Sequence, residues 1–69
     1  MRDVTIDQEP VELFKVLKFE GLASSGAEAK NAIADGLVSV NGEIELRKRR
    51  KLYAGDTINF ADDALVLVI

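Results

Sequence analysis

Apolar and polar residues alternate in several short stretches of the chain. Val4 and Ile6 alternate with polar residues over positions 2–7, and this period of two predicts a half-buried strand. The same period returns after residue 36, with turn-forming residues between the stretches. It predicts further strands over 37–40, 43–46, 57–60 and 64–69.

A helical pattern separates the first strand from the others. Pro10 suits the first position of a helix, where its missing N–H leaves no bond unmade, and apolar residues fill most faces up to Gly21. Ser25 and Glu28 match a capping box at the start of a second helix, in which each side chain accepts the other residue's backbone N–H. Gly36 is a typical residue for the end of that helix.

The register of the hairpin after the second helix has two possible solutions. A two-residue Asn41-Gly42 turn would place valines opposite glutamates on one face. A three-residue loop that includes Glu43 would instead place Val40 opposite Ile44. Because a one-residue slip moves every side chain to the other face, we expect the apolar match and the longer loop, with Gly42 at positive φ.

These elements predict an α+β domain. Two packed helices should cover one face of a small antiparallel sheet of four to five strands. The 69 residues leave room for one domain, residues 1–69.

What the composition lacks disfavours several kinds of activity. The chain has no cysteine and no histidine, which excludes disulfides, thiolate metal sites and any Ser-His or Cys-His nucleophile. Asp62 and Asp63 are adjacent in a predicted turn, where carboxylates rarely form an acid–base pair. We therefore expect no enzyme activity, no metal, no cofactor and no small-molecule substrate.

The hydropathy pattern also bears on location. The longest apolar run, residues 64–69, is far too short to cross a bilayer, and the first residues lack the apolar stretch of a signal peptide. We expect a cytoplasmic monomer with no membrane partner.

Charge is distributed very unevenly along the chain. The formal net charge is −3, yet five of the nine basic residues form one uninterrupted run over 47–51. The remaining four cations and twelve acids total −8. Since the Debye length is roughly 8 Å at physiological salt, a docked phosphate would sense the run more than the distant acids. The run predicts one cationic surface for a polyanion, provided that its side chains project together beside the second helix and are not neutralised by acids.

A longer pattern spans the helices and strands. After Ser25 and the Ala29-Lys30 pair, the chain contains the stretches Gly36-Leu37-Val38-Ser39-Val40-Asn41-Gly42 and Gly55-Asp56-Thr57-Ile58. In this order they resemble the S4 RNA-binding domain, and the whole chain resembles the small stand-alone S4-like proteins of bacteria. The resemblance implies a helix–turn–helix with strands, the αL motif, which cradles structured RNA without catalysis of its own.

The chain departs from that family pattern at several basic positions. S4 domains usually begin their first helix with Arg-Leu-Asp, where this chain has 12–14, Glu-Leu-Phe. Family members often have arginine on either side of the capping serine, where this chain has Ser24 and Gly26. We therefore expect the RNA contacts to have moved toward residues 47–51, with Lys30 and Lys18 completing the patch.

The sequence thus predicts a ribosome-associated RNA-binding module. The partner should be structured RNA, ribosomal or transfer RNA, recognised mainly through phosphate and shape. The alternative is a protein-interaction adaptor whose basic run docks an acidic partner. For Ser25 and Asn41 a purely structural role competes with RNA contact: Ser25 would cap a helix, and Asn41 would form a turn. The predicted RNA-binding residues are Lys18, Ser25, Lys30, Asn41, Arg47, Lys48, Arg49, Arg50 and Lys51.

Overall fold

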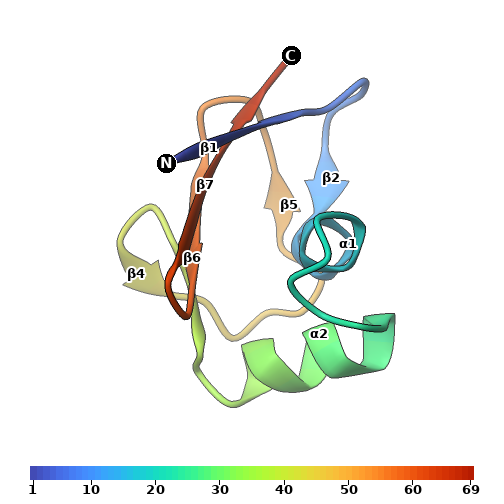
Figure 1. Cartoon of the computed structure of the whole chain (residues 1–69), viewed down its shortest axis with the longest axis vertical. Helices are drawn as coiled ribbons and strands as arrows, with labels where there is room; N and C mark the ends of the chain where they lie inside the picture. The colour runs from blue at the N-terminus through green and yellow to red at the C-terminus, as the bar shows by residue number, and fades with distance from the viewer.

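The computed structural model describes all residues, 1–69, and places two helices on one side of a sheet (Figure 1). Short loops join nine elements in chain order. They are β1 (Arg2–Thr5), β2 (Val11–Glu12), α1 (Leu13–Phe19), α2 (Gly26–Ala34), β3 (Val38–Val40), β4 (Glu43–Ile44), β5 (Lys51–Leu52), β6 (Thr57–Phe60) and β7 (Asp63–Val68). The predicted α+β architecture is confirmed.

The main sheet has five strands in the order β1-β7-β6-β3-β4, and β2 and β5 form a separate two-stranded sheet. All pairs are antiparallel except β1 with β7, which run parallel. The sheet is therefore mixed, where the sequence predicted an antiparallel one. The pairing continues beyond β1, because the Ile6 N–H donates to the Val68 carbonyl at 2.8 Å.

The core lies between the sheet and the helices. Alternate residues of β3, β6 and β7 point inward, as a period of two requires. Each large aliphatic side chain buried there contributes roughly 1.5–3 kcal/mol of transfer free energy. The largest fully buried side chains are Leu13, Leu17, Ile33, Val38, Val40, Leu52, Ile58, Leu65 and Leu67.

Helix α1 begins later than the sequence predicted. Pro10 follows a cis peptide bond and is not the first helical residue. Val11 pairs with Leu52 and Glu12 with Lys51, so these residues are extended and the helix starts at Leu13. Pairing with β5 outweighs the helical preference of Val11 and Glu12. The hydrophobic pattern of residues 10–21 cannot reveal this pairing, because β5 lies far along the chain.

The hairpin prediction was wrong in its register. Val40 pairs with Glu43, and the turn has two residues, Asn41 at φ 52° and Gly42 at φ 87°. Two successive residues at positive φ are the signature of a type I′ turn. The positive φ of Gly42 is confirmed, but Ile44 lies on the outer face and is 68% exposed.

The caps of α2 largely follow prediction. The Glu28 N–H donates to the Ser25 hydroxyl at 3.1 Å. The Glu28 carboxylate, however, accepts from the Ser24 hydroxyl and does not reach back to the Ser25 backbone. At the other end Gly36, at φ 77°, lets the chain leave the helix, and its N–H donates to the Ile33 carbonyl at 3.0 Å.

Candidate nucleic-acid interface

The basic segment, defined as Arg47–Lys51, is attached through its backbone to the start of α1. The Leu13 N–H donates to the Arg50 carbonyl at 2.9 Å, and the Phe14 N–H donates to the Lys48 carbonyl at 3.2 Å. The first N–H groups of a helix have no partner inside the helix, so these carbonyls satisfy them. The segment crosses from the sheet to the helices as part of the link between β4 and β5 (Figure 1).

A buried carboxylate orients two of the five cations. Glu45 is 7% exposed and lies on the core-facing side of the hairpin, since its N–H donates to the Val38 carbonyl at 3.0 Å. Its oxygens accept from the Arg47 backbone N–H, Nε and Nη2, each at 3.0 Å, and from Arg50 Nη1 at 2.7 Å. One carboxylate is therefore shared by two guanidinium groups.

These bonds change the titration of the cluster. The Arg47 and Arg50 side-chain hydrogen bonds lower the pKa of Glu45 to about 2, against the opposing effect of desolvation by burial. The same hydrogen bond to Glu45 raises the pKa of Arg47. Glu45, Arg47 and Arg50 therefore all remain charged near neutral pH, and together they carry one net positive charge.

The other cations of the basic segment are less constrained. Arg49 lies 3.8 Å from Glu12, which also holds Lys15 at 3.1 Å, and both pairs are weak because both cations are exposed to water. Lys48 is exposed and forms no ion pair, and Lys51 is likewise free. The acids neutralise the segment only in part.

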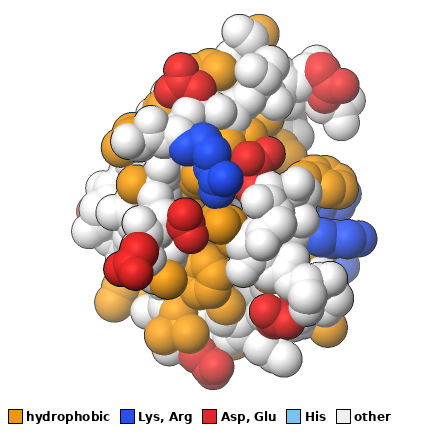
Figure 2. Space-filling view, viewed as in Figure 1, with side chains coloured by type: hydrophobic (Ala, Val, Ile, Leu, Met, Phe, Trp, Pro, Cys, Tyr) orange, Lys and Arg blue, Asp and Glu red, His pale blue; other side chains and the backbone are white.

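Four of the five cations of the basic segment line a common hollow of about 490 Å³: Arg47, Arg49, Arg50 and Lys51. Including Lys15 and Lys30, this region carries seven cations against the two carboxylates of Glu12 and Glu45, so five positive charges remain. Figure 2 shows acids scattered over one face and a group of Lys and Arg side chains projecting from the edge on the side of α1.

Phe14 connects this surface to the second helix. The Lys30 Nζ lies 4.6 Å and the Arg49 Cζ 5.6 Å from the centroid of its ring, both within cation–π range. A Cβ placed on Gly26 would lie 3.7 Å from the same ring. The ring therefore holds the start of α2, Lys30 and the basic segment together. Sequence reasoning missed this role, although an aromatic residue in place of the family's usual acid was a visible signal.

Three predicted site residues lie outside this arrangement. Ser25 caps α2 through its hydroxyl oxygen, and Lys18 is exposed on α1 without lining the hollow. Asn41 occupies the β3–β4 turn, on the opposite side of the molecule from α1 (Figure 1). Its amide oxygen accepts from the Thr57 N–H at 3.0 Å, and its amide nitrogen donates to Asp56 at 3.1 Å. The geometry of Asn41 is thus that of a structural bridge between two turns.

Two other kinds of site have no counterpart in the structure. No helix has the length and apolar character needed to span a membrane. No group of three or more acidic side chains is placed to hold a metal ion.

Comparisons with known proteins identify relatives of the chain. A family model described as an S4 domain matches residues 4–69. The chain is 52% identical over 58 residues to "Putative RNA-binding protein YbcJ" of Escherichia coli (strain K12), covering 84% of this chain and 83% of that protein. It is 38% identical over 55 residues to "Probable ribosome maturation protein RlbA" of Bacillus subtilis (strain 168), covering 80% and 78%.

A solved structure extends the likeness to the whole fold. The solution structure of YbcJ from E. coli, described as revealing an αL motif involved in RNA binding, superposes with a TM-score of 0.76 at 46% identity. The match covers 100% of this chain and 89% of that one. The resemblance seen in the sequence is confirmed, and the chain belongs to the S4 domain family.

Proposed function

We propose that the protein binds structured RNA through the basic segment and Lys30, and that its target is ribosomal RNA. One observation carries the proposal: five net positive charges gather on and beside the basic segment, whose backbone is bonded to α1, on a chain whose net charge is −3. The names of the relatives support it, since one is described as RNA-binding and another as a ribosome maturation protein.

The chemistry of the surface suits phosphate groups. Arginine presents a planar fork that matches two phosphate oxygens, and lysine adds a compact point charge. Lys48 and Arg49 are the most available, because Arg47 and Arg50 already share Glu45. Few aromatic rings are present for stacking, so phosphate positions and RNA shape dominate recognition.

Acids elsewhere on the molecule favour one orientation of approach. They repel a polyanion that arrives on the wrong face, while the cations attract it to α1 and the basic segment. We further propose that the protein is a cytoplasmic monomer. It would act by binding, without catalysis of its own, in keeping with a sequence that lacks histidine and cysteine.

A salt titration tests the proposal. If three to five cations contact phosphates of a duplex stem, the logarithm of the association constant for an RNA hairpin should fall against the logarithm of salt concentration with a slope of roughly −3 to −4.5. Fluorescence anisotropy with a labelled ribosomal RNA hairpin measures this slope. No binding at low salt would contradict the proposal, and nuclease-resistant capture of an acidic protein would then favour the adaptor function.

A further inference from the structure

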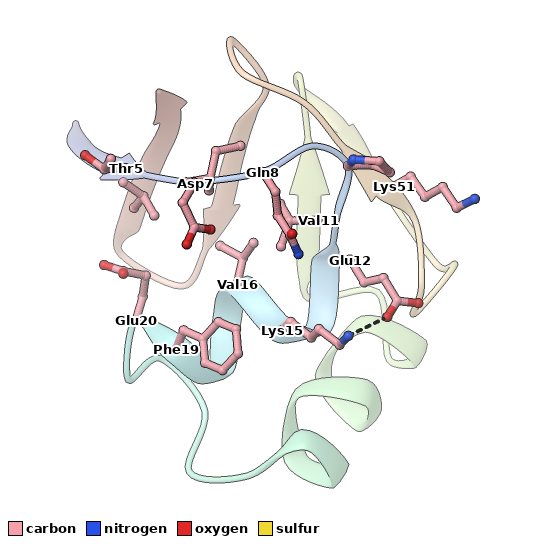
Figure 3. A pocket seen from close by; sticks show the side chains of 13 residues that line it. Thr5, Asp7, Gln8, Val11, Glu12, Lys15, Val16, Phe19, Glu20 and Lys51 are labelled. Carbon is pink, nitrogen blue, oxygen red and sulfur yellow. Dashed lines mark ion pairs between the residues drawn. The ribbon is translucent and has the colours of Figure 1, made fainter. Parts of the chain in front are cut away.

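A second hollow lies between α1 and the segment that links β1 to β2 (Figure 3). Its volume is about 470 Å³, within the range typical of sites for small organic groups. Val11 and Val16 form its apolar floor, and Phe19 stands at its edge. Although it lines the hollow, Phe19 is 70% exposed, so one side of its ring is free to stack against another planar group.

Hydrogen-bond acceptors and a hydrogen-bond donor border this apolar floor. In Figure 3 the side chains of Asp7 and Gln8 point from the linking segment toward α1 and into the hollow. A carboxylate accepts hydrogen bonds only, whereas a carboxamide both donates and accepts. Such a border can satisfy the hydrogen-bonding edge of a flat heterocycle that lies on the apolar floor.

The two hollows meet at one residue. Lys51 lines both the basic hollow and this second one, and in Figure 3 its side chain extends outward from the end near Glu12. A nucleic acid held on the basic segment therefore passes directly beside the second hollow. This continuity favours a nucleic acid as the occupant over an unrelated small molecule.

The charges of the second hollow determine which part of a nucleotide enters it. Asp7, Glu12 and Glu20 contribute three carboxylates, against the ammonium groups of Lys15 and Lys51. A phosphate inside would be repelled by these acids, but a neutral base would not. The phosphates of the same strand would remain outside, on the cations beyond Lys51.

We propose that this hollow receives one unpaired base of the bound RNA, stacked on Phe19 and bordered by Asp7 and Gln8. The inference rests on the proposed RNA-binding function and adds the kind of structure recognised, a stem with an extruded nucleotide. A paired base is already stacked within its helix and cannot enter. Guanine suits the acceptor-only Asp7 best, because its pairing edge presents adjacent N–H donors.

The test compares two RNA hairpins that differ only in one unpaired guanosine within the stem. Anisotropy titrations would use the wild type, Phe19→Ala, and Tyr53→Ala as the matched control, since Tyr53 is a 50% exposed aromatic residue outside the hollow. The wild type should bind the bulged hairpin about tenfold more tightly than the paired one, as expected for one base stacked on an aromatic ring. Phe19→Ala should remove most of this preference and leave the affinity for the paired hairpin within about twofold, while Tyr53→Ala should change neither.

The possible results distinguish a failure of the base site from a failure of RNA binding itself. Equal binding of the two hairpins by the wild type, or an equal loss for both in Phe19→Ala, would overturn the base site and leave RNA binding intact. Failure to bind either hairpin at low salt would overturn both. Circular dichroism of each variant excludes misfolding, which is not expected for a side chain as exposed as Phe19.

Discussion

Reversing two charges in the basic segment, Lys48→Glu with Arg49→Glu, should weaken RNA binding about 100-fold at physiological salt, because two phosphate contacts become repulsions. Both side chains are exposed and contribute little to the fold: Lys48 has no ion-pair partner, and Arg49 lies 3.8 Å from Glu12 and 5.6 Å from the centroid of the Phe14 ring. The loss should shrink as salt rises, and the slope of the salt titration should become shallower by about 1.8 units. Anisotropy titrations at several salt concentrations measure both effects.

The choice of residues depends on the structure. From the sequence alone, Arg49 and Arg50 would be the natural pair to reverse. Arg50, however, is hydrogen-bonded to buried Glu45, and a glutamate there would place two carboxylates together. A loss of binding could then reflect a loss of folding.

A matched control variant distinguishes the effect of the basic segment on RNA affinity from the effect of the protein's net charge. Arg2→Glu with Lys18→Glu changes the net charge by the same amount, but neither residue lines the basic hollow. We expect this control to weaken binding by less than about threefold. Equal weakening by the two double variants would mean that net charge, and not the basic segment, governs binding.

Glu45→Gln should lower the free energy of unfolding by about 2 kcal/mol at pH 7, because it leaves two arginines without their shared carboxylate. The carboxylate is buried, but Arg47 is mostly exposed and can be rehydrated, which keeps the loss below that of a fully buried pair. Urea denaturation followed by circular dichroism measures the difference.

The stability difference between the wild type and Glu45→Gln should depend on pH in a defined direction. The pKa of Glu45 is lowered from 4.5 to about 2, so its stabilisation is complete above pH 4.5 and disappears as the pH falls toward 2. The stability gap between wild type and Glu45→Gln should therefore close over that interval. Glu43→Gln, on an exposed neighbour in β4, should leave stability unchanged at every pH. A gap that stays constant from pH 7 to pH 2 would contradict the role assigned to Glu45.

Glu45 also explains where sequence reasoning about the fold succeeded and where it failed. Period and turn residues located α2, β3, β6 and β7 closely, because each of these elements buries a regular apolar face. The hairpin register was wrong because apolar matching treats a glutamate as a surface residue. Here Arg47 and Arg50 compensate Glu45, and side-chain pairs of this kind depend on a loop conformation that the sequence pattern does not determine.

The candidate interface was predictable to a similar extent. A run of five cations is visible in any reading of the sequence, and Lys30 followed from the family pattern. The backbone bonds that fix the segment to α1 and the ring of Phe14 between Lys30 and Arg49 were not visible, because they join positions far apart in the chain. Asn41 was proposed from the same pattern, yet its side chain is bonded within the protein.

We expect RNA to lie on the basic segment where its backbone is bonded to α1, beside Lys30 of α2. Titration of ¹⁵N-labelled protein with an unlabelled ribosomal RNA hairpin, followed by NMR, tests it most directly. The largest amide shifts should cluster at residues 47–51, at Phe14 and at Lys30. Shifts centred instead on the β3–β4 turn around Asn41, with the basic segment unmoved, would contradict it.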